Sequence, residues 1–560
     1  MFEFASWGYG EWAATVAALV LGVFLIGGAW AVTRPQEEVL GHPKGLYMLF
    51  FAEMWERFSY YGMRALLTLY LVKHWLYSDG SANLIYGAYT SLVYITPVLG
   101  GWLADRYLGQ RKAVLFGAVL LTLGHFFMAF EGDGSGHTND PTLNVFWLAL
   151  ALIIVGSGFL KANISVIVGQ LYPRTDIRRD SAYTIFYMGI NLGAACGVLI
   201  AAFLGETVSW SLGFGLAGFG MLVGLIVFVI GKPLLRGNGE PPAPAKLKEK
   251  VAGINLEYLL YGVGFLGVAV IWALIQYQET VGWILLVSGI ALLGYVLFEA
   301  FKLDNEARDR VFAMIFLILL MPLFWGLFEQ AGGSLNLFTD RHVDKGGIPT
   351  TFFQSINPIY IILLGPLFAG LWQWLANKGI EPSTPAKMGL GIVQMGLAFV
   401  VMVWGAENFS TGEAGALMMP VLFLFLFYLL STTGELCLSP VGLSAMNRLS
   451  VRHMASLMMA AFFFGTAGGN YVAGFMGSLM GEGEGGNMTR ELALNAYWNM
   501  GLVAVGVGLV VMVVSPLVKK LMHLDSLRDD DDASEASRVF GDAEVGEPQA
   551  GGIHPASKND

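Results

Sequence analysis

Four charged side chains interrupt the apolar run between residues 46 and 72, namely Glu53, Glu56, Arg57 and Arg64. Their spacing of three, four and seven residues predicts that they share one face of a helix, on the same side as Tyr60 and Tyr61. That face cannot contact lipid, because an isolated charge in hydrocarbon is strongly disfavoured. It either lines a water-filled cavity or forms a buried ion-pair network that only holds helices together. Two arginines are more than an ion-pair network that only packs helices together would need, which favours the alternative that this face lines a cavity.

Three more charges stand inside other apolar runs: Lys161 in GFLKAN, Glu329 in FWGLFEQ and Glu435 in TGELCLSP. Together with the charges of residues 46–72, they offer cations to a carboxylate, acids to an amine, and carboxylates able to carry protons. A zwitterionic ligand matches this inventory. The inference rests on chemistry, since spacing along the chain does not bring different helices together.

The elements that position these charges are membrane helices. Of the 560 residues, 55% are hydrophobic and 13% are charged, against about 25% charged in soluble domains. Apolar runs of about 20 residues, the length that crosses a bilayer as a helix, recur along the chain. We predict fifteen helices, over residues 12–33, 46–72, 83–104, 111–130, 142–171, 181–204, 208–231, 256–276, 281–301, 311–338, 353–376, 387–404, 415–438, 453–480 and 492–518.

Several classes of chemistry lack support in the sequence. The two cysteines, Cys196 and Cys437, both fall in predicted membrane helices, and the eight histidines show no metal-binding spacing. No nucleophile with a base is visible, so an enzyme is not expected, nor is a metal or another cofactor. The net charge of -10 reflects an acidic tail that begins RDDDD at residue 528, which reads as disordered and solvated. No nucleic-acid partner is expected.

Lys and Arg predict the orientation, because basic loops stay in the cytoplasm. The loops on one side of the predicted helices collect most of the basic residues, including the Pro/Gly-rich linker at 232–250. This places the N-terminus in the periplasm and the C-terminus in the cytoplasm of a multi-pass inner-membrane protein. The segment 12–33 lacks a basic start and a convincing cleavage site, which favours a retained helix over the alternative, a signal peptide.

Five segments carry a resemblance to a known family. They are FAEMWERFSYYGMR at 51–64, GGWLADRYLGQRK at 100–112, FYMGINLG at 186–193, QSINP at 354–358 and ELCLSP at 435–440. In this order they resemble the proton-dependent oligopeptide transporters of the major facilitator superfamily, whose first bundle helix carries the motif Glu-x-x-Glu-Arg.

The resemblance implies an all-α membrane protein of two six-helix bundles with its site at the midplane. The expected divisions are an extra N-terminal helix and loop (1–45), the first bundle (46–232), a linker with two inserted helices (233–309), the second bundle (310–520) and the tail (521–560). The family's helices leave the segment 12–33 unaccounted for. The implied function is proton-coupled import of di- and tripeptides by alternating access, with the lipid-embedded monomer as the functional unit.

Roles for individual residues are also implied by the resemblance. Arg64 and Lys161 are expected to bind the peptide carboxylate, and Tyr61 and Tyr94 to line the pocket. The residues expected around the amino end and the second-bundle side of the peptide are Asn191, Trp325, Asn357, Glu435 and Ser439. The proton-coupling residues are expected to be Glu53, Glu56, Arg57 and Glu329.

Position 462 departs from the family pattern. Phe462 stands where the family's tryptophan is expected, which either enlarges a side pocket or is a neutral packing variant. Relatives with the same fold have also changed substrate, so a facilitator that moves nitrate, amino acids or drugs is the alternative function. Retention of Arg64, Lys161 and Glu435 favours a zwitterionic peptide.

Overall fold

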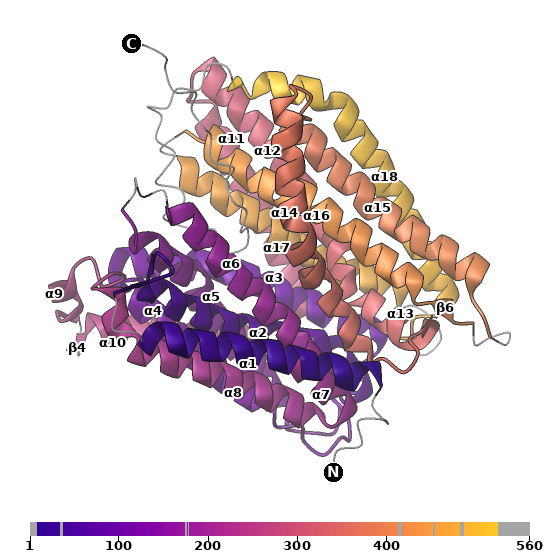
Figure 1. The fold of residues 1–560 in the computed structure, drawn as a ribbon, viewed down its shortest axis with the longest axis horizontal. Coiled ribbons are helices and arrows are strands. Elements are labelled where there is room, and N and C mark those ends of the chain that lie inside the picture. Colours follow the sequence, from indigo (N-terminus) through magenta and orange to yellow (C-terminus); the bar gives the residue numbers. More distant parts are fainter. Residues whose placement is uncertain are drawn as a thin grey trace.

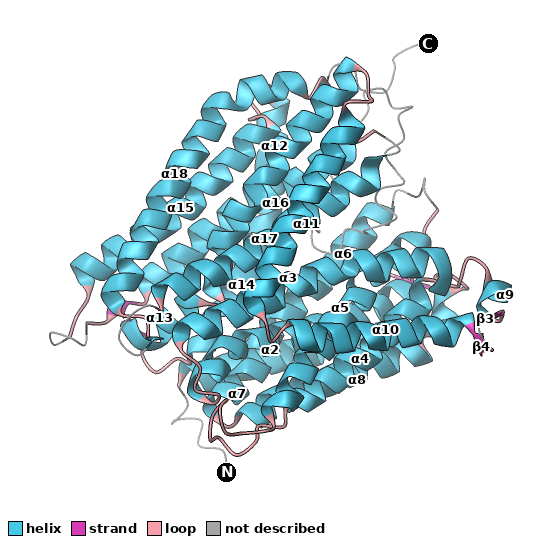
Figure 2. Ribbon diagram, turned by 180° about the vertical axis from the view of Figure 1, so that it is seen from behind, coloured by secondary structure: helices cyan, strands magenta, loops and turns pink. Residues whose placement is uncertain are grey.

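The protein is helical almost throughout (Figures 1 and 2). The structure, a computed structural model, describes residues 8–33, 37–173, 176, 178–251, 253–412, 417–451, 454–481 and 486–524. The predicted acidic tail, apart from its first four residues, lies outside these ranges, and so do residues 1–7.

The first half of the chain forms one bundle, drawn in indigo to magenta in Figure 1. Its long helices are α1 (Tyr9–Thr33), α2 (Lys44–Lys73), α3 (Asp79–Leu103), α4 (Gln110–Met128), α5 (Leu143–Gln170), α6 (Arg178–Cys196) and α8 (Trp210–Ile230). Its shorter elements are the strands β1 (Glu38–Val39) and β2 (His42–Pro43), the π-helical turns η2 (Ala104–Leu108) and η3 (Gly197–Ala202), and α7 (Phe203–Thr207). β1 and β2 pair as an antiparallel hairpin that leads into α2.

A linker with two long helices follows. It contains η4 (Lys232–Leu235), α9 (Pro244–Leu247), the antiparallel pair β3 (Lys250–Val251) and β4 (Ile254–Asn255), α10 (Leu256–Leu274) and α11 (Gln278–Ala300). Helix α10 packs against α5 of the first bundle and α11 against α17 of the second (Figure 2). The inserted hairpin therefore contacts both bundles.

The second bundle is drawn in pink to yellow in Figure 1. Its helices are α12 (Asn305–Phe328), α13 (Ser334–His342), α14 (Ile356–Asn377), α15 (Thr384–Phe409), α16 (Leu422–Leu449), α17 (Ala455–Met480) and α18 (Arg490–Leu521). The 3₁₀ turns are η5 (Glu329–Ala331) and η6 (Thr350–Ser355), and the strands β5 (Val343–Asp344) and β6 (Met419–Pro420) pair in parallel.

Each of the fifteen predicted helices has a counterpart among the described residues. Thirteen segments are long and apolar enough to cross a membrane. Helices α2 and α17, of 30 and 26 residues, also have that length. Both contain polar side chains buried in the protein, such as Glu53 in α2 and Asn470 in α17, which lowers the hydropathy of the helix without exposing a charge to lipid.

Two of the predicted helices differ clearly from the structure in where they begin and end. The segment 311–338 is not one helix, because α12 ends at Phe328 and η5 and a Gly332–Gly333 turn separate it from α13. A Cβ on Gly332 would lie 2.0 Å from Tyr86 Oη, so only glycine fits this break. The helix predicted at 415–438 instead runs from Leu422 through Pro440 to Leu449. Proline within a membrane helix is tolerated where neighbouring groups satisfy the freed backbone.

The two bundles meet closely at one end of the molecule. We call this the closed end; it contains Lys73, Asp79, Asp340 and Arg341, and the opposite end, which contains the linker, is the linker end. At the closed end Lys73 Nζ lies 2.8 Å from Asp340 Oδ2, and Arg341 donates to both oxygens of Asp79 at 2.5 and 2.8 Å. Both ion pairs join the first bundle to the second.

Glycines let helices of the two bundles approach at backbone distance. A Cβ added to Gly87 on α3 would lie 2.7 Å from Gly474 Cα on α17. Such contacts between small residues are typical of membrane helices that pack closely.

Candidate substrate cavity

A cavity lies between the two bundles. Its lining comes from α2, α3, α6 and η3 of the first bundle and from α12, η5, η6, α14 and α16 of the second. It contains about 990 Å³ of empty space, including the part that is continuous with solvent.

Ten of the predicted site residues line this one cavity. They are Arg57, Tyr61, Arg64, Tyr94, Asn191, Trp325, Glu329, Asn357, Glu435 and Ser439. They come from six different helices and η5, so the fold brings together groups that lie up to 382 positions apart in the sequence.

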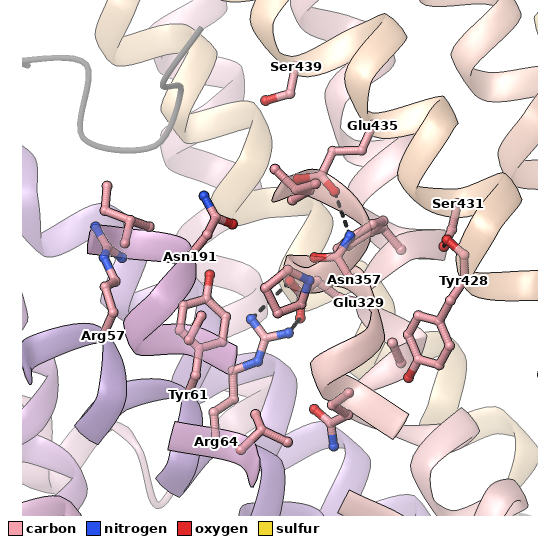
Figure 3. Close-up of a pocket in the computed structure, with 18 of the residues that line it drawn as sticks. Arg57, Tyr61, Arg64, Asn191, Glu329, Asn357, Tyr428, Ser431, Glu435 and Ser439 are labelled. Carbon is pink, nitrogen blue, oxygen red and sulfur yellow. Dashed lines mark hydrogen bonds and ion pairs between the residues drawn. The ribbon is translucent and has the colours of Figure 1, made fainter. Parts of the chain in front are cut away.

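The charges in the cavity are separated by sign. Arg57 and Arg64 project from α2 of the first bundle, whereas Glu329 and Glu435 belong to the second bundle (Figure 3). One side of the cavity therefore attracts a carboxylate and the other attracts an ammonium group.

Arg64 and Glu329 form an ion pair across the cavity. Arg64 Nη1 donates to Glu329 Oε1 at 3.2 Å, and Nη2 lies 3.1 Å from Oε2. The Tyr86 hydroxyl donates to the same carboxylate at 2.9 Å, and the Arg64 guanidinium lies 5.3 Å from the centre of the Tyr61 ring. The carboxylate of the second bundle is therefore held by two helices of the first.

The Glu-x-x-Glu-Arg motif forms a buried cluster on α2. Arg57 Nε donates to Glu53 Oε1 at 2.8 Å and lies 3.4 Å from Glu56 Oε2. All three side chains are buried, but Arg57 lines the cavity whereas Glu53 and Glu56 do not. The predicted single face of α2 is thus partly a cavity wall and partly an internal ion-pair cluster, which combines the two alternatives drawn from the sequence.

Lys161 does not line the cavity. Its side chain is buried on α5, with Nζ 4.0 Å from the centre of the Tyr60 ring and 5.2 Å from that of Tyr94. Tyr94 is itself a cavity residue. The cation therefore lies behind the aromatic wall, and a direct contact with ligand would need this wall to move.

The second bundle presents a bonded pair of polar groups. Asn357 Nδ2 donates to Glu435 Oε2 at 2.8 Å and lies 3.0 Å from Thr432 Oγ1 (Figure 3). On the first bundle, Asn191 Nδ2 donates to the carbonyl of Tyr187 at 3.2 Å, one turn earlier on α6. The side-chain oxygen of Asn191 remains as an acceptor on the cavity side.

Phe462 lies in the core of the second bundle. It is 2% exposed, and a Cβ on Gly442 would meet its ring at 2.9 Å, so α16 packs directly against it. The residue is not part of the cavity lining.

Sequence reasoning missed several cavity residues: Tyr187, Gln354, Tyr428 and Ser431. Helical spacing could have found most of them. Tyr428, Ser431, Glu435 and Ser439 recur every three or four residues and all line the cavity from α16, as Tyr187 and Asn191 do from α6. Gln354 opens the QSINP segment, and its Nε2 donates to the Ala65 carbonyl of α2 at 3.3 Å.

Within the described ranges, no three His, Cys, Asp or Glu side chains come together as metal ligands would.

Comparison with known proteins identifies the family. The model of the POT family matches residues 111–492. The chain belongs to the POT family. It is 35% identical over 514 residues to the peptide transporter YePEPT of Yersinia enterocolitica, covering 86% of this chain and 96% of that protein. It is 30% identical over 521 residues to a di-/tripeptide transporter of Lactococcus lactis, covering 88% and 99%.

Solved POT structures share the fold. A crystal structure of a mutant POT peptide transporter in complex with alafosfalin matches with a TM-score of 0.74 at 33% identity, covering 89% of this chain and 99% of that one. The predicted family and the all-α major facilitator fold are therefore confirmed. The family model begins after the 51–64 segment, so the charged face of α2 is assigned from its own geometry.

Proposed function

We propose that this protein imports di- and tripeptides together with protons across the cytoplasmic membrane. Membership of the POT family supports transport, and the names of the Yersinia and Lactococcus relatives support peptides as the substrate. The division into bundles at residues 46–232 and 310–520 and the monomer as the functional unit remain predictions.

The observation that carries the proposal is the separation of charge across the cavity. A peptide is a zwitterion whose two termini are fixed by its backbone, whatever its side chains are. Its carboxylate is attracted to Arg57 and Arg64, and its ammonium group to Glu435 beside Asn357. Rings such as Tyr61 and Trp325 then contact varied side chains, which gives broad specificity.

The loops at the linker end carry most of the Lys and Arg residues, and basic loops stay in the cytoplasm. We therefore infer that the closed end faces the periplasm. The conformation described here is then inward-facing, with Lys73–Asp340 and Arg341–Asp79 closing the outer side. Transport requires these contacts to break while contacts form at the linker end, which rocks the two bundles around the cavity.

Proton coupling requires that a proton favour one conformation over the other. Glu329 meets this need, because its carboxylate binds Arg64 and Tyr86 across the bundle interface. Protonation removes the charge that holds Arg64, which weakens this contact. Arg64 is then available to a peptide carboxylate.

The experiment is uptake of labelled dialanine into proteoliposomes under an inward-directed pH gradient. We expect unlabelled di- and tripeptides to compete, and single amino acids and nitrate not to compete. Competition by nitrate or by single amino acids, without competition by peptides, would instead support a facilitator for those solutes.

A further inference from the structure

Helix α1 has no role in the mechanism described above. None of the described residues of α1 lines the cavity. Helix α1 packs along α2, α6 and η3 of the first bundle, where the ring of Phe51 occupies the space beside Gly28 and Cys196 Sγ lies 3.7 Å from the Ala17 carbonyl. Its opposite face is apolar and exposed, as expected of a lipid-facing surface; the side chains there include Val16, Leu19, Val23 and Ile26.

The start of α1 reaches both bundles. A Cβ added to Gly10 would lie 2.8 Å from Phe203 Cε2 on α7 and 3.1 Å from Pro349 Cδ, just before η6. Gly10 is buried by these contacts. In Figure 1 α1 begins beside α7, at the closed end. A helix that otherwise packs on the first bundle therefore touches the second bundle at its first turn.

A carboxylate joins the bundles at the same place. Glu206 on α7 accepts hydrogen bonds from Thr350 N, Thr351 N and Thr351 Oγ1, each at 2.8 Å. The Thr350 hydroxyl in turn donates to Asp340, the partner of Lys73. We call Phe203, Glu206, Pro349, Thr350 and Thr351 the α7–η6 junction.

We propose that Glu206 is a positioning residue for transport and that α1 is a brace on the α7–η6 junction, so that together they stabilise the conformation closed at this end. The proposal rests on the proposed function, because the junction joins two bundles that must separate here during alternating access. Charge-assisted hydrogen bonds to backbone N–H groups are among the stronger polar contacts in proteins. Their loss on opening biases the equilibrium toward the closed state. The same junction leads directly into α14, which carries Asn357.

The test measures the distance between the bundles at the closed end. Spin labels are placed at Thr138→Cys, in the loop between α4 and α5, and at Glu491→Cys, at the start of α18, which are both exposed positions. Cys196 and Cys437 are buried and do not compete for label. Distance distributions of the full-length protein in lipid nanodiscs report the fraction of molecules open at this end.

Two variants disrupt the junction, and each has a matched control. Glu206→Gln keeps the size of the side chain but replaces one acceptor oxygen by a donor. Its control is Asp344→Asn. Asp344 is an exposed carboxylate at the same end, and it accepts a hydrogen bond from the nearby Gly346 N. Gly10→Val inserts a side chain between α1 and the junction, whereas Gly22→Val adds the same group where no atom lies within 4 Å of the new Cβ.

We expect Glu206→Gln and Gly10→Val each to raise the open fraction by about tenfold, the usual scale of coupling between conformation and a local contact set. The two controls are expected to leave the distribution unchanged. If Gly10→Val does not insert, Gly10→Ala, which still meets Phe203, replaces it. Parental distributions for Glu206→Gln and Gly10→Val, or an equal shift with Gly22→Val, would overturn the proposal.

The failure of this inference and that of the proposed function are distinguishable. Dialanine uptake by the unlabelled parent tests the function, and the distance distributions test the junction without any substrate. Melting temperatures of the same samples separate a conformational shift from a damaged fold, because an unfolded fraction broadens the distribution instead of adding a second defined distance.

Discussion

At the scale of single residues, opposite charges face each other across one cavity. Arg64 and Glu329 are paired at 3.1 Å and both are almost fully buried. A buried ion pair of this kind is weak evidence for stability, because desolvation offsets the attraction. A functional role, in which one partner is released to the ligand, explains its position better.

We predict that Arg64→Ala lowers peptide uptake by about 100-fold or more. Truncating one partner of a buried charged pair costs about 2–5 kcal/mol in binding, and Arg64 is the cation nearest to the second-bundle carboxylate. Arg308→Ala, which removes an arginine bonded to Asn305 on α12, is the control and keeps parental uptake. The measurement is the initial rate of dialanine uptake at equal protein amounts. A parental rate for Arg64→Ala would show that Arg64 does not bind the peptide.

Phe462→Trp is predicted to destabilise the fold without changing peptide preference. The buried ring packs against Gly442, and overpacking a core costs about 1–3 kcal/mol. Phe475→Trp, at an exposed position of the same helix, leaves the melting temperature unchanged. A Phe462 variant with parental stability and an altered preference among dipeptides would place position 462 at the ligand.

Much of the cavity could be predicted from the sequence: charges inside apolar runs indicated Arg57, Arg64, Glu329 and Glu435, and the family resemblance indicated most of the others. Ten of the fourteen named residues line it. The sequence could not predict whether a charged residue reaches the cavity or lies behind the aromatic side chains that line it. Lys161 is covered by Tyr60 and Tyr94, and only tertiary packing determines which ring covers which cation.

At the scale of elements, apolar length identified the long helices, but hydropathy alone did not predict where they break or continue. Gly332 and Gly333 follow α12 and η5, and a side chain at Gly332 would overlap Tyr86 of α3. Pro440 does not end α16, which continues to Leu449. The glycine turn depends on a neighbour distant in sequence, which hydropathy does not contain.

Helix α1 is predicted to cross the membrane. If it spans the membrane, a periplasmic reporter fused ahead of Glu3 is active and one fused after Lys520 is inactive. The reason is that α1 adds one crossing to an even number of bundle and inserted helices, which places the two ends on opposite sides. A cytoplasmic reporter at each site should give the reverse pattern. Equal activity of one reporter at both ends would show that α1 does not cross.

At the scale of the whole molecule, proton coupling and peptide movement should be separable. Glu329→Gln cannot ionise and resembles the protonated carboxyl, so the proton no longer changes the relative free energies of the two conformations. We predict loss of uphill, pH-driven accumulation with exchange of labelled for unlabelled peptide retained. Glu279→Gln, at the start of α11, serves as the control. A role limited to packing would instead lower yield and melting temperature and leave the coupling of the remaining protein intact.

The central claim is that a proton gradient drives peptide inward. One pH unit corresponds to about 1.4 kcal/mol, so each coupled proton supports about tenfold accumulation per pH unit. The most direct measurement is the steady-state ratio of internal to external labelled dialanine in proteoliposomes with an acidic outside. We predict a ratio well above one that falls to one when a protonophore removes the gradient. A ratio that stays at one under the gradient, or one that a protonophore leaves unchanged, would contradict it.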